Sequence, residues 1–185
     1  MRNTDVPANR WGRAAQEGDA EAFGRLVLAD AGTARRVAYA VVGNWDEAED
    51  VVQDAALAAW QAIARFDANR PFRPWFLRIV ANAALDQVRR RRVRHTEPLP
   101  EALEAPGISP ERWTDQVLLS ERVAAALAKL AERQRVAVML FDLEGYSHAE
   151  IATILGVPEG TVRSYVFHAR RALRQSLGSL VEEPT

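Results

Sequence analysis

The sequence predicts an all-α protein, built as two small helical domains joined by a flexible linker. The chain is rich in Ala, Leu, Glu, Arg and Gln, which are good helix formers. Apolar residues recur at helical spacing, and no convincing segment alternates apolar and polar residues as a half-buried strand does. A proline-rich stretch without either periodicity divides the chain in two.

The composition is that of a globular protein, with 48% hydrophobic and 26% charged residues among 185. A net charge of −1 gives no hint of a nucleic-acid partner. The charges are nevertheless separated along the chain. Acidic residues gather in 46–54, and basic residues gather in 78–94 and 163–174. This separation predicts two kinds of surface, each with its own partner.

Several classes of function are disfavoured. The absence of cysteine excludes disulfides, a Cys-ligated zinc site and thiol catalysis, and it fits a cytoplasmic location. The three histidines, His95, His148 and His168, form no metal-ligand or catalytic spacing, and no glycine-rich phosphate loop occurs. No signal peptide or membrane-spanning run is present. We therefore expect no enzyme activity, no cofactor, no metal and no membrane insertion.

The amino-terminal domain is expected to cover residues 10–94. Asp19 can cap a first helix, whose buried residues are Phe23, Leu26 and Val27. A second helix over 33–42 ends at Gly43. Asn44 and Glu47 form a variant of the capping box, followed by a helix with the apolar stripe Val52, Ala55, Ala59, Ile63 and Phe66.

The acidic start of that third helix carries an exposed polar patch, formed by Asp50, Gln53 and Asp54. A protein surface is the plausible partner, because DNA would repel these side chains. The alternative is that the patch is only a solvated, well-capped helix end.

The next segment mixes aromatic residues with arginines. A loop over 67–74 precedes a helix over 75–92 that buries Phe76, Ile79, Val80 and Ala83. Such a mixture suits single-stranded DNA, since bases stack on rings while cations follow the backbone. The candidate DNA-binding residues in this mixture are Phe72, Arg73, Trp75, Arg89 and Arg90. Two alternatives stay open: Trp75 belongs to the core, or the arginine run only offsets the helix dipole.

The proline-rich span 95–113 is expected to be the linker, and residues 114–180 form the second domain. Its first helix carries the apolar residues Val117, Leu118, Val123, Leu127 and Leu130. Its second carries Val136, Met139, Leu140 and Leu143, and stops near Gly145.

A helix-turn-helix follows. Ser147 and Glu150 form a capping box, Gly156 ends a short helix and Pro158 can begin a longer one. The outward side chains of the longer helix would read bases in the major groove; they are Arg163, Ser164, Phe167 and His168. Arginines further along would reach phosphates, namely Arg170, Arg171 and Arg174. The alternative is a basic helix on a solvated face. For His148, a solvent-facing place in the capping box is expected.

With these segments in this order, nearly the whole chain resembles the extracytoplasmic-function (ECF) sigma factors of bacterial RNA polymerase. The resemblance rests on several motifs in order: GDAEAF at 18–23, AEDVVQD at 48–54, FRPWFLRIVAN at 72–82, ERQR at 132–135, GYSHAEIA at 145–152 and GTVRS at 160–164. The family commonly has a large apolar residue where Ala56 stands and a proline where Ala131 stands, differences that we expect to alter packing rather than function.

The resemblance implies that the first domain is sigma region 2. It would dock on the β′ clamp helices of the core polymerase through Asp50, Gln53 and Asp54, and capture the non-template strand of the −10 element. In the family, the loop that matches 66–74 holds a flipped-out base. The resemblance implies that the helix with Arg78 and Asn82 supports this contact, which adds both residues to the candidates for −10 DNA binding. The second domain would be sigma region 4, which meets the β flap and reads the −35 element as a duplex through Arg163, Ser164, Phe167, His168 and Arg171.

Two further expectations follow from the resemblance. An anti-sigma factor is a common partner in the family, although no residue here identifies one. No regulatory domain is expected after Leu180. The competing hypothesis is a helix-turn-helix regulator that acts without joining the polymerase, against which the aromatic–arginine segment and the Asp50 patch argue.

Overall fold

The computed structural model describes residues 5–94 and 123–177, and within these ranges it contains helices and no strand, as predicted. In chain order, the helices are α1 (Asp5–Gln16), α2 (Ala20–Val42), α3 (Trp45–Ala62), the 3-10 turn η1 (Ile63–Arg65), α4 (Phe72–Arg94), α6 (Glu132–Asp142), α7 (His148–Leu155) and α8 (Glu159–Leu177). Residues 123–128 are also helical. The predicted linker at 95–113 lies outside the described residues, as do Val117 and Leu118.

Helix α2 replaces the two helices that were predicted before Gly43. Its ends are as expected: the Asp19 carboxylate accepts from the amide of Ala22 at 3.0 Å, and Gly43 adopts a left-handed φ of 81°. The prediction of a break before Thr33 was wrong, because Gly32 stays helical. A glycine costs a helix only about 1 kcal/mol, and the buried face of α2 continues on both sides of Gly32.

Helix α4 begins at Phe72, earlier than the predicted Trp75. Pro74 falls in the first turn, where a missing backbone N–H removes no intrahelical hydrogen bond. The early start places the aromatic and arginine residues on one rigid helix rather than on a loop.

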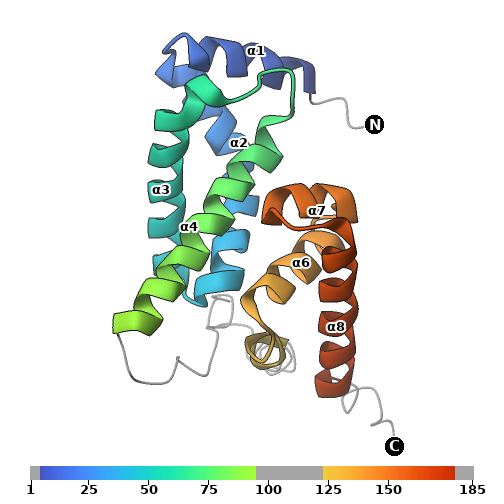
Figure 1. Cartoon of the computed structure of the whole chain (residues 1–185). Helices are drawn as coiled ribbons and strands as arrows, with labels where there is room; N and C mark the ends of the chain where they lie inside the picture. Colours follow the sequence, from blue (N-terminus) through green and yellow to red (C-terminus); the bar gives the residue numbers. More distant parts are fainter. Residues whose placement is uncertain (1–4, 95–122, 178–185) are drawn as a thin grey trace, which may run out of the picture.

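The two halves of the molecule pack side by side (Figure 1). Helices α2, α3 and α4 form one bundle with α1 across its end. Helix α6 packs on α2, α7 packs on α4, and α8 packs on α6 and α7. The larger apolar cluster runs through both halves: Phe76 and Leu77 of α4 belong to the same buried cluster as Leu140 of α6 and Ile151 of α7. Burial of this surface is the main stabilising term. One predicted apolar position was wrong, since Leu143 follows the end of α6 and is 75% exposed.

Candidate nucleic-acid interface

The predicted helix-turn-helix is present as α7 and α8. Both hydrogen bonds of the capping box form: the amide of Ser147 donates to Glu150 Oε2 at 2.8 Å, and the amide of Glu150 donates to Ser147 Oγ at 3.3 Å. Gly156 ends α7 with a left-handed φ of 64°, a conformation that most side chains would strain. These local contacts fix the angle at which α8 leaves the turn.

One face of α8 is buried and the other is free for a ligand. Val162, Val166 and Ala169 point into the protein. The outward face carries the side chains that were predicted to read or hold DNA, and all of them are exposed: Arg163, Ser164, Phe167, His168 and Arg171. Phe167 is 61% exposed, which is unusual for an aromatic ring and gives the face an apolar centre.

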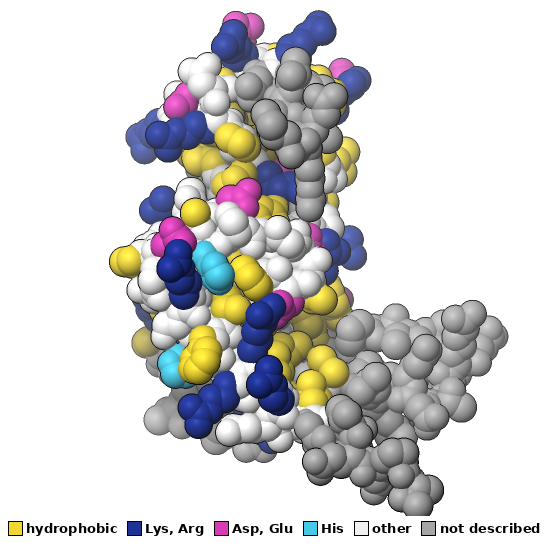
Figure 2. Space-filling model, turned by 90° about the vertical axis from the view of Figure 1, so that its right-hand side faces the viewer, with side chains coloured by type: hydrophobic (Ala, Val, Ile, Leu, Met, Phe, Trp, Pro, Cys, Tyr) yellow, Lys and Arg dark blue, Asp and Glu magenta, His cyan; other side chains and the backbone are white. Residues whose placement is uncertain are grey.

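Arginines surround this apolar centre (Figure 2). Beside α8 lies an open groove of about 810 Å³, lined by Phe141, His148, Arg163, Val166, Phe167, Arg170, Arg171 and Arg174. His148 stacks on Phe141 at 4.4 Å between ring centroids, and it is half-buried in the wall of the open groove rather than fully in solvent. The guanidinium of Arg170 lies 4.9 Å over Phe141 and pairs with Asp142. Arg163 pairs with Glu159 at 2.6 Å. The groove therefore offers cations and ring faces together.

A second cluster of rings lies where α4 begins. Trp75 is half-buried, with its ring centroid 5.0 Å from Phe66 and 5.5 Å from Phe72. Phe72 is only 3% exposed and stacks on Phe76. Phe72 thus supports the cluster and offers no open ring face, contrary to the prediction of direct DNA contact. Trp75 is both core-packed and partly accessible, so the two interpretations of this ring are compatible.

The remaining candidates on α4 differ in their surroundings. Arg78, Asn82, Arg89 and Arg90 are exposed. Arg73 instead pairs with Asp30 of α2, a carboxylate that is 5% exposed. Burial raises the pKa of Asp30, and the hydrogen bond and charge of Arg73 oppose that rise. This pair, in which Asp30 is buried and Arg73 is partly exposed, fixes the start of α4 against α2.

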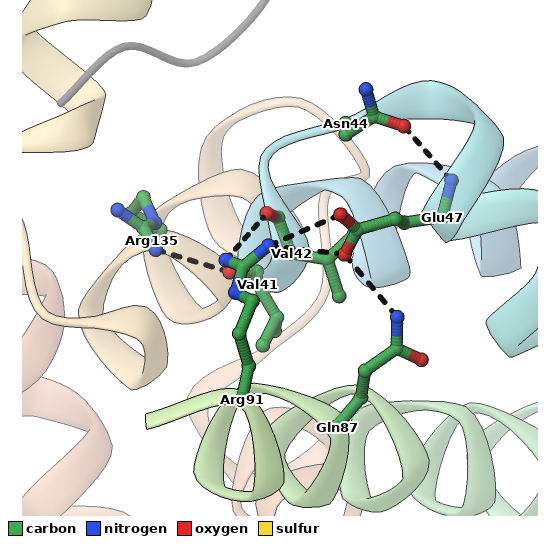
Figure 3. A network of polar contacts seen from close by, with 7 residues as sticks. All are labelled: Val41, Val42, Asn44, Glu47, Gln87, Arg91 and Arg135. Carbon is green, nitrogen blue, oxygen red and sulfur yellow. Dashed lines mark hydrogen bonds and ion pairs between the residues drawn. The ribbon is translucent and has the colours of Figure 1, made fainter. Parts of the chain in front are cut away.

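The acidic patch lies on α3, away from the groove of α8. Asp50, Gln53 and Asp54 are all exposed, and Leu57, one turn further, is 63% exposed. At the start of α3, Glu47 accepts hydrogen bonds from Gln87 and Arg91 of α4, which fixes the two helices together (Figure 3). The patch combines carboxylates with an apolar side chain, a surface that suits a protein rather than DNA.

Three charged residues to which the sequence analysis assigned no individual role contribute polar contacts to the packing. Asp30 is one; the others are Arg135 and Glu144, which bind α2 from the carboxy-terminal half. Burial, the largest cause, lowers the pKa of Arg135. The sequence offered one signal for Arg135: it directly precedes the apolar run 136–140, on the buried side of α6.

Known proteins match both halves of the chain. The sigma-70 region 2 family matches residues 26–94, and the sigma-70 region 4 family matches residues 120–173. The ECF RNA polymerase sigma factor SigW of Bacillus subtilis is 32% identical over 175 residues, which cover 89% of this chain and 94% of SigW.

Two solved structures superpose on most of the chain. CnrH in complex with the cytosolic domain of CnrY superposes with a TM-score of 0.71 at 28% identity, covering 94% of this chain and 98% of CnrH. The sigma factor RpoE in complex with the anti-sigma factor NepR, from Bartonella quintana, gives a TM-score of 0.69 at 28% identity, covering 84% and 96%. Across residues 5–94 and 123–177, no helix is long and apolar enough to cross a bilayer. The chain belongs to the ECF RNA polymerase sigma factors.

Proposed function

We propose that this sigma factor binds core RNA polymerase and directs initiation at promoters by recognising the −10 and −35 elements and helping to open the DNA. The observation that carries the proposal is the presence of two different DNA-suited surfaces and one acidic surface in a single chain. The factor performs no bond chemistry itself, because bond formation belongs to the polymerase, and it acts in the cytoplasm with that enzyme.

The −35 element is read by residues 114–180. Helix α8 enters the major groove with Arg163 and Ser164 near its amino-terminal end, where such helices contact base edges. Arg163 leaves Glu159 and forms paired hydrogen bonds with guanine, while Phe167 meets thymine methyl groups. His168 contacts the same site, and Arg171 holds the phosphates.

The −10 element is captured as a single strand by residues 10–94. The exposed side of Trp75 stacks a base, and Arg78, Asn82, Arg89 and Arg90 follow the backbone along α4. Extruding a base costs a few kcal/mol, which stacking and pocket contacts must offset. Phe72 and Arg73 act indirectly. Phe72 packs against Trp75 and supports its ring, and Arg73 fixes the start of α4 on α2.

The polymerase is held by α3. Asp50, Gln53 and Asp54, with the neighbouring Leu57, face a basic and apolar groove on the β′ clamp helices, and region 4 meets the β flap. An anti-sigma factor is a further partner, since both superposed relatives were solved with another protein, which in the RpoE structure is an anti-sigma factor.

The test is association with core polymerase followed by run-off transcription. Asp50→Lys with Asp54→Lys should reduce co-elution with the core enzyme and abolish specific transcripts. Glu17→Lys, an exposed acidic residue near the end of α1, is the matched charge control and should leave both unchanged. If the unaltered protein binds DNA through α8 without ever joining the polymerase, the chain is instead a helix-turn-helix regulator.

A further inference from the structure

Helix α1 lies outside the residues that match either sigma family, and none of the side chains proposed to contact polymerase or DNA belongs to it. Figure 1 shows α1 across the end of the bundle, beside the segment that joins α3 to α4. This α3–α4 segment, residues 63–71, consists of η1 and a loop over 66–71. It leads directly to Phe72 and Trp75 at the start of α4.

Helix α1 is fixed to α2 at its carboxyl end. The chain turns between the two helices at Gly18, whose left-handed φ of 96° is a conformation that glycine adopts without strain. Across this turn the amide of Asp19 donates to the carbonyl of Ala14 at 3.0 Å, and Ala15 is completely buried. These contacts give the last turn of α1 a defined position, so its side chains can in turn position the groups that they bind.

The last residue of α1, Gln16, binds the backbone of the α3–α4 segment. Its side-chain Nε2 donates to the carbonyl of Phe66 at 2.5 Å and to that of Ile63 at 3.3 Å. Carbonyls at the end of a helical turn have few partners within the helix, and an amide group with two N–H donors can bind both of them. Gln16 therefore fixes the point at which η1 ends and the loop begins.

A second contact with α1 sets the position of the Phe66 ring. Gly12 is buried, and a Cβ placed on it would lie 3.2 Å from Cε1 of Phe66, which is closer than an ordinary van der Waals contact. Helix α1 thus approaches this ring more closely than a helix with a side chain at residue 12 could. Because Phe66 lies 5.0 Å from the ring of Trp75, the position of α1 also affects the side chain that is proposed to stack a base.

The loop itself is held by Asp67 and, from α1, by Arg13. Asp67 Oδ1 accepts from the amide of Asn69 at 3.0 Å, and the Asp67 carbonyl accepts from the amide of Arg70 at 2.9 Å. Arg13 Nη2 donates to Asn69 Oδ1 at 3.3 Å. These side-chain contacts are exposed, and water competes for the same groups, whereas the contact of Gln16 is partly buried and therefore stronger. Gln16 is the α1 residue on which the shape of the loop depends most.

We propose that Gln16 is a positioning residue for capture of the −10 strand: by binding the carbonyls of Phe66 and Ile63, it holds the loop and the ring of Trp75 ready for an extruded base. Gln16 does not itself need to touch DNA. A binding surface that is already ordered avoids the entropic cost of ordering it when the ligand binds. The inference rests on the proposed function for its ligand, whereas the ordering of the loop can be tested on the free protein.

The ordering is tested by amide hydrogen exchange of the free chain, followed residue by residue by nuclear magnetic resonance. Gln16→Met keeps the length of the side chain but removes both donors. A hydrogen bond contributes about two- to tenfold to an equilibrium constant, so the amides of Phe66, Asn69 and Arg70 should exchange about two- to tenfold faster. Gln16→Glu also lacks the donors and should accelerate exchange at least as much.

The matched control is Gln87→Met. Gln87 is also half-buried, and it donates to Glu47 at 3.2 Å, a contact between α4 and α3 that does not involve the loop. The amides of the loop should therefore keep the parent rates in this variant. Unchanged rates in Gln16→Met, or equal acceleration in Gln16→Met and Gln87→Met, would refute the ordering of the loop by Gln16.

The consequence is tested on the complex with core polymerase, using templates that differ at each −10 position. Gln16→Met should reduce strand opening about two- to tenfold and weaken the base preference at one −10 position. Association with polymerase and the preference at the −35 element should stay at parent values, because the proposed contacts for both lie on other helices. A fold that is merely destabilised would lower all of these quantities together, and that result would refute a positioning role.

The results also separate this inference from the proposed function. A parent protein without any base preference at the −10 element would refute the proposed function and, with it, the role of Gln16 in strand capture. A parent preference that Gln16→Met retains in full, with unchanged strand opening, would refute the positioning role alone and leave the proposed function standing.

Discussion

Replacing Arg163 with alanine tests the −35 assignment at a single side chain. Arg163 lies near the start of α8, at the edge of the buried face formed by Val162 and Val166, and its side chain is 67% exposed. Its truncation removes no buried contact, so helix α8 should keep its place. Any effect on promoter use then reports the lost contact with DNA.

The magnitude follows from what Arg163 exchanges on binding. A bidentate contact with guanine contributes about 1–3 kcal/mol of discrimination. Binding breaks the exposed pair with Glu159, 2.6 Å long, and such pairs contribute only about 0.5 kcal/mol. The net loss for Arg163→Ala is therefore about 0.5–2.5 kcal/mol, or roughly 2- to 70-fold in use of the cognate −35 sequence.

The assay is run-off transcription from templates that differ at each −35 position, with core polymerase in excess. Arg163→Ala should relax the preference at one base pair and leave the others unchanged. Arg174→Ala, a neighbouring arginine assigned to phosphate, should weaken all templates equally. An equal loss on every template for Arg163→Ala, or no loss at all, would show that Arg163 does not read a base.

Two further predictions concern the start of α4 and the contact between the halves. Trp75→Leu should impair strand opening more than duplex binding, because stacking of a base on an aromatic ring contributes about 1–3 kcal/mol. Strand opening is measured by the reactivity of unpaired thymines with permanganate. Equal losses in opening and in duplex binding would show that the ring has only a structural role. Glu144→Gln should lower the free energy of unfolding by about 1 kcal/mol at neutral pH. This value already allows for the weakening of the ion pair by solvent, because Arg36 is partly exposed. Since the folded pKa of Glu144 lies below its ordinary 4.5, this stabilisation is present above pH 4.5 and disappears as the pH falls through the folded pKa. Denaturation curves of both proteins should therefore converge in acid, and a constant difference would contradict the pair.

Helix caps and helix ends were predictable from the sequence, because they depend on contacts between residues that are close together in the chain. The caps at Asp19 and Asn44 and the capping box of Ser147 each satisfy an amide three residues away. The left-handed ends at Gly43 and Gly156 follow from the same local rule. Such positions need no knowledge of distant helices.

Contacts between distant segments were not predictable in the same way. Glu144 and Thr33 are 111 residues apart in the chain, and Arg135 lies 95 residues from its partner Ala40. The spacing of apolar residues along a helix does not indicate which distant helix a charged side chain will contact. The same reason explains the wrong prediction for Phe72. Its neighbours in the sequence suggested a ring exposed for DNA contact, but packing in the folded chain buries it.

The carboxyl end of α2 is served by two guanidinium groups with different origins. Arg91 of α4 reaches the carbonyl of Val42 at 3.5 Å, while Arg135 reaches those of Ala40 and Val41. Arg91 belongs to the same bundle as α2 and is anchored there by Glu47. The last turn of α2 therefore keeps a cation from its own half of the chain and does not depend on Arg135 alone.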